Sequence, residues 1–149
     1  MKMEDKELLL KDLCARLPYF ENWVQYDGKD YMVTGYGHGR VSLLPSMFSS
    51  AVGPCPLVEE VKPYLRPMSS MTEEEKIELS RLCHFTAVSE NCETIEHGIR
   101  ILDEISGDFY APNIVVDAID WLNANHFDYR GLIDKGLALE TPEGMYKTE

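Results

Sequence analysis

The sequence contains no long apolar segment. No stretch approaches the roughly 20 apolar residues that an α-helix needs to cross a bilayer. The chain starts MKMEDKELLL, with acidic residues before the apolar ones and no small-residue cleavage site, which is not the pattern of a secretory signal. We therefore expect a soluble, cytoplasmic protein with no membrane partner.

Cysteine is scarce, and its four copies are unevenly spaced: Cys14, Cys55, Cys83 and Cys92. Disulfide frameworks belong to oxidising compartments, whereas unpaired cysteine is among the most often buried residue types. We expect reduced, buried thiols.

Paired metal ligands are also missing. The one group with soft-metal chemistry is Cys83, His84, Cys92 and His97. Cys83 and His84 are adjacent and would lie on different helix faces, so they do not converge on one ion as structural zinc ligands do. The sequence predicts no metal site and no cofactor.

Basic residues are few in the second half of the chain. Residues 73–128 hold thirteen acidic residues and three basic ones, whereas residues 1–50 hold seven acidic and six basic ones. A strongly negative field repels nucleic acids and membrane surfaces. Direct nucleic-acid binding by this segment is therefore disfavoured, and a partner with a basic surface is permitted.

Recognised catalytic motifs are absent as well. The glycines of GYGHGR (35–40) follow Gly-x-Gly-x-Gly spacing and precede a strand pattern, so we expect a hairpin turn with a solvated His38 and not a phosphate site. Cys55 lies on an expected loop with His38 or His126 as conceivable bases, but nothing in the sequence brings them together. We predict that the protein is not an enzyme; a small enzyme that uses Cys55 or a histidine is an alternative.

The first half contains a helix pattern followed by strand patterns. Leucines four residues apart predict a helix over 4–16, with Asp12 largely off its apolar stripe and Pro18 ending it. Aromatic and β-branched residues with turns at Asp27-Gly28 and in the glycine cluster 35–39 then predict a three-stranded antiparallel meander. Residues 45–71 carry five of the eight prolines and are expected to form a connection.

The second half contains helix start and stop signals. Thr72 to Glu75 matches a capping box that opens a helix to about residue 84, and another helix is expected from about 92 to 106. Pro112 opens the next helix, at the position where proline costs least. Its expected inward residues are Ile114, Ala118, Trp121, Leu122 and Asn125, and its expected outward residues are Asn113, Asp117, Asp120 and Asn123.

The C-terminal region is expected to end in a short helix and a tail. Asp128 is placed to cap a helix over 129–135, and Gly136 to stop it in a Schellman motif with Leu137 against Leu132. Residues 140–149 are expected to be extended or frayed.

Together these patterns predict an α+β fold with a small antiparallel β-meander (about residues 19–44), packed helices and a helical C-terminal half. The chain is expected to be a single domain over 1–149. Its parts are the helix, meander and proline-rich connection (1–66), the helical part (67–139) and the tail (140–149).

Candidate partner-binding residues come from the aromatic meander and the acidic half. Exposed tyrosine and tryptophan on a small sheet are typical of protein-binding surfaces. Acidic residues one helical turn apart, such as Asp117 and Asp120, equally form the hydrated face of an amphipathic helix. The candidates are Trp23, Tyr26, Tyr31, Tyr36, Glu93, Glu96, Asp103, Glu104, Asp117 and Asp120.

Three segments, LLLKDLCARLPY (8–19), VKPYLRPMSSMTEEE (61–75) and IDWLNANHFDYRGLIDKGLALETPEGMY (119–146), resemble an uncharacterised family of small proteins common in prophages and other mobile elements of gut anaerobic bacteria. Residues 20–60 and 84–118 fall outside the resemblance. It implies a bacterial or viral cytoplasmic setting and an accessory role. It brings no activity, cofactor or catalytic residue.

The preferred interpretation is a non-enzymatic accessory protein of a phage or mobile element that binds a host or phage protein. In one form it is an acidic inhibitor whose residues 73–128 occupy a basic nucleic-acid-binding groove. A further alternative is a nucleic-acid-binding module that uses Lys29, Arg40, Lys62 and Arg66, but these basic residues are few and scattered.

Overall fold

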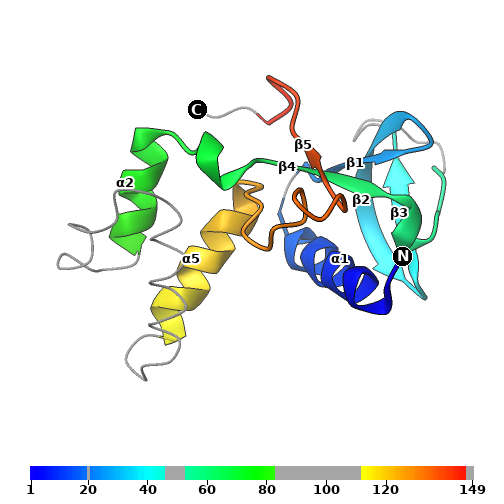
Figure 1. The fold of residues 1–149 in the computed structure, drawn as a ribbon, viewed down its shortest axis with the longest axis horizontal. Coiled ribbons are helices and arrows are strands. Elements are labelled where there is room, and N and C mark those ends of the chain that lie inside the picture. Colours follow the sequence, from blue (N-terminus) through cyan, green and yellow to red (C-terminus); the bar gives the residue numbers. More distant parts are fainter. Residues whose placement is uncertain (20, 46–52, 83–111, 147–149) are drawn as a thin grey trace. The chain divides into compact units, whose positions relative to one another are not determined.

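The computed structural model describes residues 1–19, 21–45, 53–82 and 112–146. The fold is α+β, as the sequence predicted (Figure 1). The chain divides into two compact units: unit 1 comprises Met1–Arg66 and Arg130–Glu149, and unit 2 comprises Pro67–Tyr129. The first segment of unit 1 ends at Arg66, where unit 2 begins. The C-terminal segment belongs with unit 1.

Unit 1 is built on a five-stranded sheet with the order β3-β2-β1-β4-β5. The strands are β1 (Trp23–Tyr26), β2 (Lys29–Gly37), β3 (Arg40–Leu44), β4 (Lys62–Leu65) and β5 (Leu139–Glu140). The first three form the predicted meander, and β4 pairs with β1 antiparallel and with β5 in parallel. The sheet therefore joins the two ends of the chain.

Two tight turns of one type connect the meander strands. Asp27 and Gly28 have φ values of 51° and 73°, and His38 and Gly39 have φ values of 53° and 75°. Positive φ at both central residues is the type I′ geometry that matches the twist of a hairpin. The Asp-Gly turn is as predicted, and His38 is exposed at the second turn as expected. Strand β2 runs further into the glycine cluster than the sequence suggested.

The helix α1 (Met3–Arg16) supplies one side of the main core of unit 1. Leu9 and Leu13 are buried there with residues from the sheet, from a 3-10 turn, η1 (Val58–Glu60), and from the position after it: Val24, Val41, Leu43, Val58 and Val61. Asp12, expected off the apolar stripe, is instead fully buried. The buried face is Leu9, Asp12, Leu13 and Arg16, so the stripe is rotated relative to the one the leucines suggested.

Residues 129–135, expected to be a helix, form turns instead. The predicted stop signal is present: the Leu137 N–H donates to the Leu132 carbonyl (2.9 Å) and the Gly136 N–H to that of Ile133 (3.0 Å). Gly136 has the required positive φ of 72°. Helix nucleation is costly, and tertiary packing of Leu132 and Leu137 against Leu65 fixes this segment without a helix.

Unit 2 has a 3-10 turn, η2 (Met68–Ser70), and two described helices, α2 (Glu73–Leu82) and α5 (Pro112–Ala124). The predicted capping box is present, since the Glu75 N–H donates to the Thr72 hydroxyl (3.2 Å) and the Thr72 N–H to the Glu75 carboxylate (3.0 Å). Its core residues are Met71, Leu79, Ala118, Leu122 and Phe127. The helix expected over 92–106 lies outside the described residues.

The end of α5 is a second Schellman motif, with histidine in place of glycine. The Phe127 N–H donates to the Leu122 carbonyl (3.0 Å), and the His126 N–H to that of Asn123 (3.1 Å). His126 adopts a φ of 64°, a conformation that usually favours glycine. This turn brings Phe127 back against Trp121, with ring centroids 5.7 Å apart.

Candidate functional site

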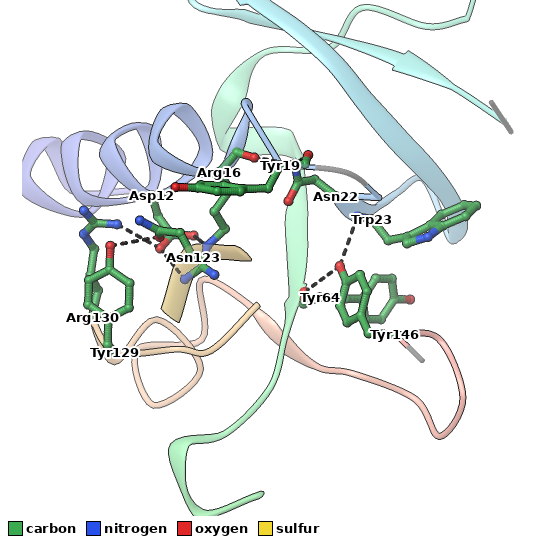
Figure 2. Close-up of polar contacts among 10 residues, drawn as sticks. All are labelled: Asp12, Arg16, Tyr19, Asn22, Trp23, Tyr64, Asn123, Tyr129, Arg130 and Tyr146. Carbon is green, nitrogen blue, oxygen red and sulfur yellow. Dashed lines mark hydrogen bonds and ion pairs between the residues drawn. The ribbon is translucent and has the colours of Figure 1, made fainter. Parts of the chain in front are cut away.

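A buried ion cluster lies in unit 1, centred on the fully buried Asp12 (Figure 2). Arg16 binds it through two bonds, Nε to Oδ2 at 2.9 Å and Nη2 to Oδ1 at 3.0 Å. The Arg130 guanidinium, from the C-terminal segment, also donates to Oδ1 at 3.2 Å. Such charge-assisted bonds stabilise a carboxylate that burial would otherwise penalise. The cluster ties α1 to residues from the far end of the chain.

The sequence contained a signal for this pair. Asp12 and Arg16 are four residues apart, the spacing of a helical ion pair, and both follow the i, i+3, i+4, i+7 pattern that starts at Leu9. Arg130 carried no comparable signal, because it lies 118 positions away in the sequence.

The turn after α1 is held by Asn22. Its side-chain amide donates to the carbonyls of Arg16 (2.6 Å) and Tyr19 (2.9 Å). Glu21 adopts a positive φ of 62° in the same turn. This arrangement leads the chain from the helix directly into β1 and fixes the position of Arg16.

Tyr146 fills a gap in the sheet. Its hydroxyl accepts from the Trp23 N–H (3.1 Å) and donates to the Tyr64 carbonyl (3.0 Å) (Figure 2). The register of β1 and β4 pairs Val24 with Pro63 and Gln25 with Lys62, so Trp23 and Tyr64 would form the next pair. The tyrosine hydroxyl takes the place of the direct backbone bond. Burial raises the pKa of Tyr146 well above its ordinary value. The expectation of an extended or frayed tail was therefore wrong for this residue.

Three polar side chains meet on the sheet beside this gap. The Tyr64 hydroxyl donates to the Asp30 carboxylate at 2.6 Å and accepts from the Gln25 amide at 3.2 Å. Burial and the neighbouring Asp30 both raise the pKa of Tyr64. The phenol therefore stays protonated at neutral pH and is unsuited to act as a base or nucleophile.

The four aromatic candidate residues are divided between two faces of the sheet. Tyr26, Tyr31 and Tyr36 are partly buried and pack against the main core of unit 1. Trp23 precedes the fully buried Val24 in β1, so its side chain lies on the opposite face. These residues do not form one aromatic patch.

The two described cysteines are exposed, which corrects the expectation of buried thiols for Cys14 and Cys55. Partial burial raises the pKa of the Cys14 thiol and so lowers its thiolate fraction. The Cys55 sulfur lies 3.9 Å from the Ser42 hydroxyl oxygen. The backbone carbonyl of Cys55 accepts a hydrogen bond from the Arg40 side chain. Cys83 and Cys92 lie outside the described residues.

The acidic candidates of the second half occupy exposed helix faces where they are described. Asp117 and Asp120 are exposed on α5, while Glu93, Glu96, Asp103 and Glu104 lie outside the described residues. Asn123, expected on the same outward face, is instead buried and accepts a hydrogen bond from the Tyr129 hydroxyl (2.9 Å). On α2, Glu73, Glu74 and Glu78 are exposed.

Each of these helix faces also carries one exposed apolar residue. Ile77 of α2 is 59% exposed and Val116 of α5 is 55% exposed. Ile77 lies one helical turn from Glu73 and Glu74, and Val116 one turn from Asp120. We call these seven residues the exposed helix faces of unit 2: Glu73, Glu74, Ile77, Glu78, Val116, Asp117 and Asp120.

Charge is divided between the two units. Unit 1 contains 13 acidic and 11 basic residues, whereas unit 2 contains 13 acidic and 3 basic residues. Nearly all of the net charge of −12 therefore belongs to unit 2. Such a concentration of one sign creates a field that attracts basic molecules and repels acidic ones.

Within the described ranges, no three His, Cys, Asp or Glu side chains are grouped to hold a metal ion. The helices of those ranges include none that is both long and apolar enough to span a bilayer. The chain matches no protein-family model, no curated protein and no solved structure. The resemblance to a prophage-associated family therefore stays a prediction.

Proposed function

We propose that the protein is a non-enzymatic interaction protein whose unit 2 binds a positively charged surface of a partner protein. The observation that carries the proposal is the division of charge: one compact unit is nearly balanced and the other holds almost all of the net negative charge. A protein that needed this charge for solubility alone would gain as much from an even distribution.

The exposed helix faces of unit 2 support the proposal. Protein interfaces commonly combine apolar anchors with a charged rim that steers association and sets specificity. Ile77 and Val116 are candidate anchors, and the surrounding carboxylates supply the rim. We place the protein among accessory proteins of phages or mobile elements and its partner among host or phage proteins. In its most specific form, unit 2 occupies a basic groove that otherwise binds nucleic acid.

The test compares two charge variants of the full chain with equal net charge. The first neutralises four unit 2 acids, and the control neutralises four exposed unit 1 acids. Each variant is immobilised and used to capture proteins from a bacterial lysate at low and moderate salt. The substitutions are Glu74→Gln, Glu78→Gln, Asp117→Asn and Asp120→Asn in the first, and Glu4→Gln, Glu7→Gln, Glu140→Gln and Glu143→Gln in the control.

We expect a protein captured by the wild type and by the control to be lost from the unit 2 variant. Its capture should also weaken as ionic strength rises, because screening shortens the range of charge attraction. Capture that is indifferent to salt, or equal for both variants, contradicts the proposal. For the specific form, the purified partner should lose nucleic-acid binding in a mobility-shift assay when the wild-type chain is added.

A further inference from the structure

The outer side of the edge strand β3 is covered by residues 53–58, which we call the edge cover. The Val41 N–H donates to the Pro56 carbonyl (2.9 Å), the Leu43 N–H to that of Pro54 (3.1 Å), and the Val58 N–H to that of Gly39 (3.0 Å). Arg40 and Leu57 form an antiparallel bridge in the same register. The cover thus pairs with β3 as an additional strand would.

At Pro54 and Pro56 this pairing is one-sided for a covalent reason. The two residues of a hydrogen-bonded antiparallel pair normally exchange two bonds, but proline has no N–H to give. Pro54 and Pro56 therefore accept from Leu43 and Val41 without donating in return. A segment in the same register with other residues at these two positions would supply both missing donors.

Several backbone groups on the outer side of the cover already have partners. The Leu57 N–H donates to the Glu60 carboxylate at 2.8 Å, and Arg40 donates to the Cys55 carbonyl at 2.9 Å. A strand that is to pair with β3 itself must replace the cover.

We propose that the β3 edge is a strand-addition site that the edge cover occupies in the free protein, and that an extended segment of a partner protein replaces the cover. Strand addition is a common mode of peptide recognition, with backbone bonds for affinity and alternate side chains for specificity. Pro56 and Val58 of the cover are buried and Cys55 is exposed. The partner segment is therefore one with alternating apolar and polar residues and no proline opposite Val41 or Leu43. The proposal concerns unit 1 and does not depend on the function proposed for unit 2.

Gly53 provides a sharp way to displace the cover. A Cβ at this position would lie 1.7 Å from the Leu43 carbonyl oxygen, a backbone atom, so no side-chain rotation can relieve the clash. Gly37, by contrast, has nothing within 4 Å of an added Cβ. The variant Gly53→Ala and its matched control Gly37→Ala thus differ in whether the same added methyl disrupts the cover.

The probes are two peptides of residues 53–60, both with Cys55→Ser. One also carries Pro54→Val and Pro56→Val, and the other keeps both prolines. Amide NMR of the full chain measures affinity and the hydrogen exchange of Val41 and Leu43. We expect the valine peptide to bind Gly53→Ala at least about tenfold more tightly than it binds Gly37→Ala, whose cover stays in place. We also expect Gly53→Ala to bind the valine peptide more tightly than the proline peptide, because the valine peptide adds two backbone bonds. Val41 and Leu43 should be protected in the complex.

Three results would overturn the proposal: no binding of the valine peptide to folded Gly53→Ala, equal binding of the two peptides, or chemical-shift changes that spare both β3 (residues 39–44) and the cover (residues 53–58). Self-association of Gly53→Ala with protected Val41 and Leu43 would assign the edge to a second copy of the chain and also overturn it. If Gly53→Ala does not fold, Arg40→Gln, which removes the bond from Arg40 to the cover, takes its place with the same expected order of affinities.

Discussion

At the scale of single residues, Asp12 and Tyr146 join parts of unit 1 that are distant in sequence. Asp12 receives guanidinium groups from positions 4 and 118 residues away. Tyr146 joins β1 and β4 through one hydroxyl that both accepts and donates. In both cases a polar group of one element completes the bonding of another.

Replacing Asp12 by Asn should destabilise unit 1 strongly. The change leaves Arg16, which is nearly fully buried, without its anion, and breaking a buried pair by removing one partner costs about 3–5 kcal/mol. The free energy of unfolding in urea measures the effect. Asp5→Asn is the control, since Asp5 is 3.9 Å from Lys135 in a more exposed pair whose loss costs at most about 1 kcal/mol. Equal losses for the two variants would show that the buried cluster contributes nothing beyond a surface pair.

Tyr146→Phe should lower the free energy of unfolding by about 1–3 kcal/mol, because the Trp23 N–H and the Tyr64 carbonyl lose their shared partner. Tyr36→Phe is the matched control, since Tyr36 packs at the edge of the core. A loss no larger than that of the control would mean that β1 and β4 close the gap by themselves.

The Tyr146 hydroxyl should also make the free energy of unfolding depend on pH in the alkaline range. Burial raises the pKa of Tyr146 above its ordinary value of 10.0, so above that pH the unfolded chain holds fewer protons than the folded one. The stabilisation is fully present below about pH 10 and is lost as the pH rises toward the folded-state value. Urea unfolding between about pH 8 and pH 11 should therefore show a steeper decline for the wild type than for Tyr146→Phe. Parallel declines would contradict this assignment.

Residue-scale features were predictable where the cause is local. The positive φ of Gly28 and Gly136 follows from residues within one turn, as do the bonds between Thr72 and Glu75. The role of Tyr146 depends on a gap between two strands 82 and 123 positions away, which no local pattern encodes. The exposed thiols of Cys14 and Cys55 were missed because the burial rule for cysteine is statistical.

At the scale of elements, the sequence predicted some start and stop signals better than the helices or strands beside them. The stop at Gly136 has its two Schellman bonds, although turns and not a helix precede it. Strand β4 was missed because Pro63 argues against a strand in the interior of a sheet. The pairing of β4 with β1 covers two residue pairs, so proline interrupts little of the ladder.

Thr72→Ala should destabilise α2 by about 0.5–2 kcal/mol, because the Glu75 N–H loses its acceptor. Faster hydrogen exchange of amides at the start of α2 measures the change. Thr72→Ser keeps the hydroxyl and should restore most of the protection. If serine fails to do so, the methyl group and not the cap is responsible.

At the scale of the whole molecule, the two units have separate cores. Leu9 belongs to the main core of unit 1 and Leu122 to that of unit 2, and both are fully buried. Sequence patterns predicted the α+β character, but not the return of Arg130–Glu149 to unit 1. That return depends on pairing between β4 and β5, a contact between distant segments.

Leu9→Ala and Leu122→Ala should each cost about 2–5 kcal/mol in the unit that contains the cavity. Hydrogen exchange resolved by residue should show faster exchange in the sheet for the first variant and in α5 for the second. Uniform acceleration throughout the chain by either variant would show that the two units unfold as one.

The contribution of β5 to unit 1 has a consequence for biosynthesis. A ribosome delivers α1 and strands β1 to β4 well before it delivers Leu139–Glu140 and Tyr146. All of unit 2 is translated in the interval. Domains generally fold as units during synthesis, so unit 1 cannot complete its sheet before all of unit 2 has been translated. Strand β4 gains its partner β5 only after that point.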